Sequence, residues 1–181
     1  MTRSELEHLI RTAADIANDD EIVVIGSQAI LGQFPEAPAP LRVSVEADLF
    51  PKHHPERAEL IDGSIGEGSP FHATYGYYAQ GVDETTAVLP DGWRDRLVAV
   101  RNQNTRGATG WCLEAHDLTV AKAVAGREKD TVFVQDIIRL GLVDALVLRD
   151  RLAATSLDPD RRARIAALFD RALSARDRPR P

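Results

Sequence analysis

Apolar residues near the N-terminus recur every three or four positions, which is the spacing of one face of a helix. Ser4 and Glu7 stand three residues apart in the pattern of a capping box, and the predicted helix ends before the polar residues 18–20. Residues 21–25 (EIVVI) are rich in β-branched side chains and predict a short buried strand. The apolar positions of the predicted helix are Leu6, Leu9, Ile10, Ala13 and Ala17.

Residues 41–49 alternate strictly between apolar and polar side chains, which is the period of a strand with one buried face. Glu46 and Asp48 fall on the polar face, so both carboxylates are expected to project from the same side of the strand. Asp83 and Glu84 form a predicted turn between two further strand patterns. The two strand patterns beside this turn cover residues 74–82 and 85–89. Two later strand patterns cover residues 93–101 and 111–114.

The rest of the chain has helical patterns. Gly126 and Gly141 follow two of these helices and are typical of helix C-termini. The predicted helices cover residues 117–125, 130–140, 143–154 and a last segment that starts at 158–159. We therefore predict an α+β fold, with a mixed sheet and flanking helices over residues 1–115 and a C-terminal helical bundle over 116–181 packed on that core.

Composition narrows the class of protein. The chain has 181 residues, of which 28 are acidic and 22 basic, for a net charge of −6, and this acidic balance argues against a protein that binds duplex DNA. No apolar run has the roughly 18 residues that a membrane span needs. Residues 1–20 have no apolar core of a signal peptide, and Cys112 is the single cysteine, so we expect a cytoplasmic protein without disulfides.

Glu46 and Asp48 are the first candidates for chemistry. Two like charges about 6–7 Å apart along a strand repel each other, and a divalent cation between them would remove that cost. Mg²⁺ needs only one or two protein carboxylates when substrate phosphates supply other ligands. The alternative is an edge strand that exposes charges to water.

Two other segments carry residues suited to phosphate. Gly26 and Ser27 follow the buried strand and precede a helix start, where backbone N–H groups and a hydroxyl hold phosphate groups. Lys122 and Arg127, with Asp130 after them, place cations at a helix end, and phosphoryl transfer requires positive charge around a triphosphate. The alternative for this second group is an ordinary ion cluster at a helix terminus.

A glycine-serine turn followed by two carboxylates at i and i+2 resembles the nucleotidyltransferase superfamily, although the first carboxylate there is usually Asp, where this chain has Glu46. The Lys-x4-Arg spacing with Asp130 resembles the AbiEii-type nucleotidyltransferase toxins. Segments such as VVIGSQAILGQFP, LRVSVEADLFP and DLTVAKAVAGREKD resemble the bacterial DUF6036 nucleotidyltransferase-like group, with the likeness covering about residues 20–140.

The resemblance implies an enzyme that uses a nucleoside triphosphate with Mg²⁺, or Mn²⁺ in its place, held by Glu46 and Asp48. Gly26, Ser27, Lys122, Arg127 and Asp130 would bind the nucleotide, and Lys122 would also serve in catalysis. The acceptor implied is an RNA end, such as that of a tRNA, or a protein hydroxyl, and the chain would be the toxin partner of an antitoxin protein. A non-catalytic nucleotide- or partner-binding module of the same fold is the alternative.

Several other polar and aromatic residues leave alternatives open. His53 and His54 are adjacent, but no third ligand is spaced nearby in the sequence, so a metal is not predicted there. Tyr75, Tyr77 and Tyr78 suit either base stacking or packing, and packing is the commoner use of aromatic residues in strands. A third carboxylate for the site is open among Asp83, Glu84, Asp130 and Asp136.

Overall fold

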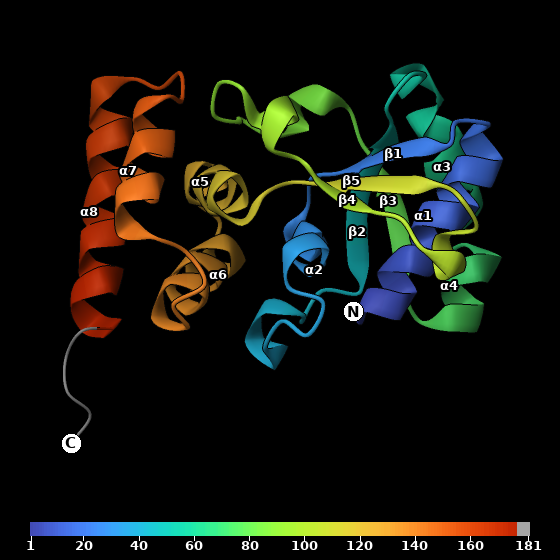
Figure 1. The fold of residues 1–181 in the computed structure, drawn as a ribbon, viewed down its shortest axis with the longest axis horizontal. Helices are drawn as coiled ribbons and strands as arrows, with labels where there is room; N and C mark the ends of the chain where they lie inside the picture. Colours follow the sequence, from blue (N-terminus) through green and yellow to red (C-terminus); the bar gives the residue numbers. More distant parts are fainter. Residues whose placement is uncertain (177–181) are drawn as a thin grey trace. The chain divides into compact units, whose positions relative to one another are not determined.

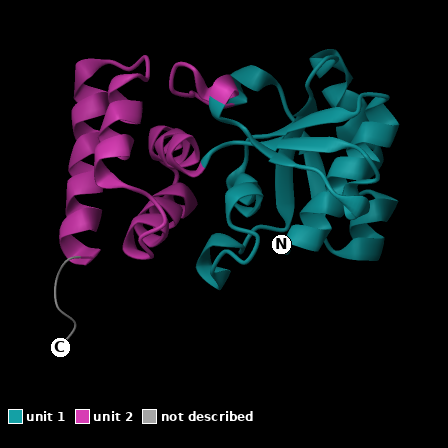
Figure 2. Cartoon of the chain, in the orientation of Figure 1, with its two compact units in different colours: residues 1–86, 96–114 teal, residues 87–95, 115–181 magenta. Residues whose placement is uncertain are grey.

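The computed structural model describes residues 1–176, and these residues form two compact units. The first unit comprises residues 1–86 and 96–114, and the second comprises 87–95 and the chain from 115 on (Figure 2). Residues 87–95, which the sequence pattern assigned to the core, belong to the second unit. The division into a core over 1–115 and a helical region over 116–181 stays a prediction, and each unit is described by itself.

The first unit is built on a five-stranded mixed sheet, which confirms the predicted α+β class (Figure 1). The strand order is β3-β2-β1-β5-β4, in which β1 pairs antiparallel with β2 and parallel with β5, β2 pairs parallel with β3, and β4 pairs antiparallel with β5. The strands are β1 (Glu21–Val24), β2 (Glu46–Pro51), β3 (Tyr78–Gly81), β4 (Val98–Val100) and β5 (Thr109–Cys112).

Helix α1 (Arg3–Ala17) buries the apolar stripe expected from the sequence, but its capping box is formed by Thr2 and Glu5. Glu7, expected to close the box, is buried. Its carboxylate accepts hydrogen bonds from Arg3 Nε at 2.8 Å, Asn102 Nδ2 at 2.7 Å and Asn104 Nδ2 at 2.9 Å. Glu7 therefore ties α1 to the loop before β5.

The helices α1, α2 (Ile30–Gln33) and α3 (Ala58–Ile65) cover one face of this sheet. A Cβ on Gly110 of β5 would lie 2.9 Å from Cγ1 of Ile10 in α1, and Cys112, two residues on, lies against Gly32 of α2. Residues two apart on a strand share a face, so both helices pack on the same side. On β3, a Cβ added to Gly81 would lie 2.7 Å from the backbone carbonyl carbon of Ala58 in α3. Gly81 is opposite Leu49, Leu49 is opposite Val24, and Val24 is opposite Cys112, so α3 covers the same face.

Strand β2 begins five residues later than the alternating pattern predicts. Leu41 is buried, but Val43 and Val45 are 79% and 46% exposed, so these three apolar positions do not share one buried face. The N-terminal ammonium binds the carbonyls of Arg42 and Ser44, and the Ser44 hydroxyl accepts a bond from the backbone N–H of Glu46 at 3.1 Å. These local partners replace a neighbouring strand, and regular pairing starts only at Glu46.

The hairpin predicted over 74–89 is wrong. Ser69 caps a helix, α4 (Pro70–Tyr75), which has proline at its first position and ends at Gly76 with a φ of 77°. The strand that follows is short and pairs parallel with β2, and residues 84–86 form a 3₁₀ turn. Residues 93–96 are also a 3₁₀ turn, which confines the predicted 93–101 strand to β4.

Over its described residues, the second unit consists of helices together with the segment 87–95, in which a short 3₁₀ turn begins at Trp93. The second helix, predicted to start at residue 130, begins earlier with Arg127 as its N-cap, so Asp130 lies within its first turn. Asp117 of the first helix is fully buried and forms an ion pair with Arg151 of the third, with Nε and Oδ1 3.1 Å apart. The helices are α5 (Ala115–Ala125), α6 (Glu128–Arg139), α7 (Ala145–Ala153) and α8 (Pro159–Arg176).

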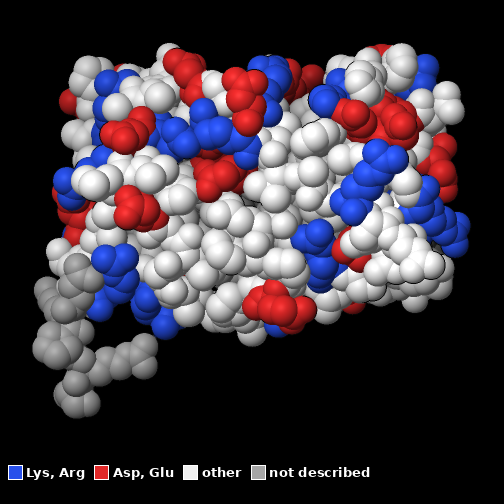
Figure 3. Space-filling view, in the orientation of Figure 1, with Lys and Arg blue, Asp and Glu red and all other residues white. Residues whose placement is uncertain are grey.

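In the described part of the chain, no helix combines the length and the apolar character that crossing a membrane requires. On the face shown in Figure 3, acidic and basic side chains lie next to one another in several groups, with uncharged side chains between these groups.

Candidate functional site

Gly26 lies directly against the carboxylate of Asp48. The backbone N–H of Ile25 donates a hydrogen bond of 3.0 Å to the carbonyl of Asp48, which brings the end of β1 to the start of β2. A Cβ added to Gly26 would lie 2.7 Å from Cγ and 2.9 Å from Cβ of Asp48, closer than real side chains approach. Gly26 has an extended backbone with a φ of −76°, so close approach, not backbone conformation, requires glycine here.

Ser27 begins a 3₁₀ turn (Ser27–Ala29) immediately after this contact. Its hydroxyl oxygen is 3.4 Å from the side-chain nitrogen of Gln28, a residue that is completely buried. Within residues 1–176, no hydrogen-bond partner reaches Oε1 of Gln28. The buried Gln28 side chain therefore donates a long hydrogen bond to the Ser27 hydroxyl, while its own Oε1 has no partner among the described residues.

Glu46 and Asp48 are half-buried on one face of β2, and Ala47 and Leu49 are fully buried on the other. The parallel pairing of β2 with β3 sets Tyr78 beside Glu46 and Gln80 beside Asp48. The Tyr78 hydroxyl donates a hydrogen bond of 3.1 Å to Oε2 of Glu46. The two carboxylates, the Gly26–Ser27 turn and Tyr78 thus gather where β1 ends and β2 begins.

The electrostatics at this position are those of an acidic cluster. Burial, followed by the negative charge of Glu46 and the hydrogen bond to it, raises the pKa of Tyr78 to about 12, and Glu67 and Asp48 contribute in the same direction. The phenol is therefore neutral at physiological pH and acts as a donor. Two hard oxygen ligands on one face, with like charge to neutralise, fit a divalent cation such as Mg²⁺.

Lys122, Arg127 and Asp130 also lie together, within the second unit. Asp130 is 2% exposed, its Oδ1 is 3.3 Å from Nζ of Lys122, and its Oδ2 is 2.6 Å from Nε of Arg127. Burial raises the pKa of Asp130, but the bonds and charges of Arg127 and Lys122 outweigh that effect and lower the pKa overall. The meeting of this cation cluster with Gly26, Glu46 and Asp48 stays a prediction.

The sequence model of one family matches nearly the whole described chain, over residues 4–171, and the description of that family is a nucleotidyltransferase of unknown function (DUF6036). The chain belongs to the DUF6036 family. The suspected membership is thereby confirmed. No curated protein and no solved structure matches the chain.

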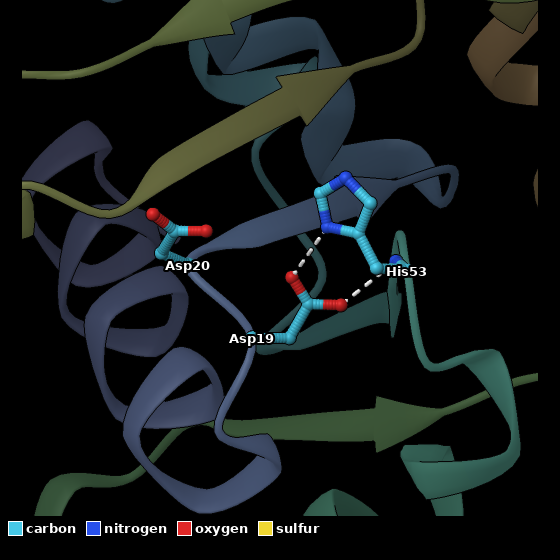
Figure 4. Close-up of side chains that lie close together, drawn as sticks. All are labelled: Asp19, Asp20 and His53. Carbon is cyan, nitrogen blue, oxygen red and sulfur yellow. Dashed lines mark hydrogen bonds and ion pairs between the residues drawn. The ribbon is translucent and has the colours of Figure 1, made fainter.

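The structure of this DUF6036 protein contains a second acidic cluster that the sequence pattern missed. Asp19, Asp20 and His53 are the three side chains in residues 1–176 whose ligand atoms all lie within 4.8 Å of one another, the spacing of a candidate metal site. Figure 4 shows the two bonds that join Asp19 to His53, with Asp20 beside them. Asp19 and His53 are 34 positions apart, so no local spacing could reveal the cluster.

This second cluster lies at the other end of the β1–β2 ladder. Asp19 and Asp20 precede β1 and His53 follows β2, whereas Gly26 follows β1 and Glu46 begins β2, an offset of about 20 Å along the strands. The Asp19 carboxylate already accepts bonds from the backbone N–H groups of Glu21, His53 and His54 and from Nδ1 of His53. A cation here would displace existing hydrogen bonds, so the geometry favours a structural role in this DUF6036 chain.

Two of the candidates for a third carboxylate of the site, Asp83 and Asp136, already have other partners. Asp83 accepts bonds from the backbone N–H and the hydroxyl of Thr85, at 2.7 and 2.6 Å, and so closes its own turn. Asp136 is paired with Arg139 at 2.8 Å on the surface of α6.

Of the three tyrosines considered in the sequence analysis, Tyr77 and Tyr78 are buried, and Tyr75 is exposed in an aromatic group with His8 and Phe71. Packing accounts for Tyr77, while Tyr78 combines packing with its bond to Glu46.

Proposed function

We propose that this chain transfers a nucleotidyl group from a nucleoside triphosphate to an acceptor hydroxyl, in a reaction that depends on Mg²⁺ or Mn²⁺. The contact between Gly26 and the Asp48 carboxylate carries the proposal, because it sets a phosphate-binding turn against a pair of hard oxygen ligands. Membership in a family of nucleotidyltransferases supports the class of reaction.

In this proposal Glu46 and Asp48 hold the cation, whose chemistry is to neutralise charge on the triphosphate. The backbone of Gly26 and the hydroxyl of Ser27 bind phosphate oxygens, and the buried Gln28 orients that hydroxyl. The acceptor oxygen attacks the α-phosphorus, the bond from that phosphorus to the bridging oxygen breaks, and pyrophosphate leaves with the electron pair. The proton of the acceptor passes to solvent or to a carboxylate.

Lys122 and Arg127 are proposed to bind the phosphates from the second unit. Asp130 supports this role because it holds both cations by ion pairs and is itself buried, so it restricts their positions. Lys122 acts as a compact charge and Arg127 as a planar fork, two complementary ways to bind a phosphate group.

The acceptor is proposed to be an RNA 3′ end, such as that of a tRNA, or a protein hydroxyl, and the chain to act as the toxin of a toxin–antitoxin pair. The resemblance of Lys122, Arg127 and Asp130 to the AbiEii-type toxins supports this part. The acidic net charge of −6 argues against a long duplex as the acceptor.

The test is to incubate the protein with each α-labelled triphosphate, Mg²⁺, cell RNA and cell protein, and to identify what becomes labelled. Label in RNA or protein from the wild type, and none from Asp48→Asn, supports the proposal. Transfer by Asp48→Asn at the native rate contradicts the role of Asp48. Nucleotide affinity that depends on Mg²⁺, without release of pyrophosphate, favours the non-catalytic binding module instead.

A further inference from the structure

Tyr78 forms a side-chain hydrogen bond with Glu46 that bears on how that carboxylate is held. The parallel register of β2 and β3 pairs Glu46 with Tyr78, so their side chains leave the sheet side by side on the same face. The backbone N–H of Tyr78 donates to the carbonyl of Val45 at 3.0 Å, which fixes the start of β3 next to the start of β2. The hydroxyl then meets Oε2 of Glu46 at 3.1 Å.

The ring of Tyr78 is itself held in place. Its centroid lies 4.6 Å from that of His72 in α4, with the planes tilted by 48°. Nδ1 of His72 accepts a hydrogen bond of 3.1 Å from the backbone N–H of Gly68, so the imidazole is anchored to the loop before α4. Tyr78 is 8% exposed and has little freedom to turn away from Glu46.

Glu46 has more need of such a partner than an aspartate would. A glutamate carries one more rotatable bond than an aspartate, so more conformational freedom is lost when its carboxylate is fixed. A bond from Tyr78 to Oε2 removes part of that freedom in advance. Hydrogen bonds of this kind, from a neighbouring residue to a metal-binding carboxylate, commonly change metal affinity 10- to 100-fold.

We propose that Tyr78 is a positioning residue for the cation site, which holds Glu46 in the rotamer that brings its carboxylate to the same cation as Asp48. This inference rests on the proposed function, since it takes Glu46 and Asp48 as the ligands. Tyr78 is not itself a ligand, because its proton is directed at Glu46.

Tyr77 provides a matched control for Tyr78. It is the preceding residue, it is also buried, and its hydroxyl also forms a side-chain hydrogen bond, 2.7 Å from Nδ1 of His8. That bond joins it to α1, on the face of the sheet opposite Glu46. Tyr77→Phe therefore removes one tyrosine hydrogen bond at the neighbouring position of the chain without touching the carboxylates.

The experiment measures Mn²⁺ affinity from the electron paramagnetic resonance signal of the free ion, with thermal melting as a check on folding. The binding that Asp48→Asn removes defines the site. Tyr78→Phe is expected to weaken this binding by about tenfold or more, and Tyr77→Phe to change it by less than about twofold. In Glu46→Gln, and in Glu46→Asp, whose shorter side chain ends further from the hydroxyl, adding Tyr78→Phe is expected to cause no further loss.

The outcomes separate this inference from the proposed function. Tyr78→Phe with the affinity of the wild type, or with an equal loss in the Glu46→Gln background, overturns the positioning role while the site defined by Asp48 stands. Equal Mn²⁺ binding by the wild type and Asp48→Asn overturns the cation site and the role of Tyr78 with it.

Discussion

The α-carbon of Gly26 faces the carboxylate of Asp48 so closely that no side chain fits between them. This contact joins two segments that are 22 positions apart and depends on the antiparallel register of β1 and β2, in which Val24 is opposite Leu49. The Gly26–Ser27 turn and a half-buried carboxylate are thereby held together where β1 ends and β2 begins. The relationship makes position 26 the most sensitive test of the site that does not alter a charged group.

Gly26→Ala is expected to displace the Asp48 side chain, because the added methyl would overlap it. Overpacking of this kind costs about 1–3 kcal/mol of unfolding free energy. Denaturant unfolding measures that cost, and Mn²⁺ titration measures the expected loss of cation affinity. Gly63→Ala is the matched control, since Gly63 lies within α3 with open space at the Cβ position and is expected to gain about 0.5–1 kcal/mol. Equal affinities in both variants would contradict the contact.

The strand at β1 and the faces of β2 could be predicted because their information is local. Four β-branched or apolar residues in succession specify a buried strand, and the alternation around Ala47 and Leu49 decides which way Glu46 and Asp48 project. The alternation failed over residues 41–45, where the N-terminal ammonium and the Ser44 hydroxyl take up the backbone groups. A terminal charge that bonds a segment 41 residues away leaves no trace in the pattern of that segment.

Helix α4 was missed although its signals are in the sequence. Ser69 and Pro70 are typical of a helix start and Gly76 of a helix end, but the aromatic residues between and after them favoured a strand.

The proximity of Gly26 to Asp48 could be suggested only by resemblance, since it depends on strand register. The bond between Tyr78 and Glu46 was not predicted at all, because the parallel pairing that creates it follows from α3 and α4 lying between β2 and β3.

Glu7 is expected to contribute strongly to stability, because it is a buried carboxylate with three donors. Burial raises its pKa, but the bonds from Asn104, Asn102 and Arg3 outweigh burial, so the pKa is lowered overall. Glu7→Gln replaces one carboxylate oxygen by an amide NH₂ group, which is a donor and would face the donors of Arg3, Asn102 and Asn104. The substitution is expected to lower the unfolding free energy, measured with denaturant, by about 1–3 kcal/mol. Glu36→Gln, at an exposed position, is the control and should change stability by less than about 0.5 kcal/mol. A cost no larger than that of the control would show that the network is not stabilising.

The ion pair of His53 with Asp19 predicts a stability that depends on pH. The hydrogen bond and charge of Asp19 raise the pKa of His53 above its ordinary value of 6.5. Protonated His53 therefore stabilises the folded state fully below about pH 6.5, and this contribution is lost as the pH rises through the raised pKa. The difference in unfolding free energy between the wild type and His53→Ala should be larger at about pH 6 than at about pH 8.5.

The same comparison in an Asp19→Asn background separates the pair from other titrating groups. Without the carboxylate, the effect of His53→Ala is expected to be the same at both pH values. If the difference in unfolding free energy between the wild type and His53→Ala does not change with pH, the ion pair is not the cause of that difference. Added Mn²⁺ should leave the effect of His53→Ala on the unfolding free energy unchanged, because the four hydrogen bonds to Asp19 already occupy its oxygens.

Lys122 tests whether the second unit takes part in the reaction. Its ammonium is paired with the buried Asp130, so Lys122→Ala is expected to lower stability by about 1–3 kcal/mol, with Arg127 still in place to neutralise Asp130. If Lys122 also binds the triphosphate, transfer falls about 10²–10³-fold when assayed well below the melting temperature. Lys122→Arg keeps the charge but replaces a compact ammonium by a planar fork, so it should restore stability more fully than transfer.

The control is Lys129→Ala, which removes an exposed cation in the same segment and should retain both the stability and the transfer rate. A Lys122→Ala protein that transfers nucleotide at the native rate would confine Lys122 to an ion pair within the helical unit, and the resemblance to the toxins would then rest on the sheet residues alone.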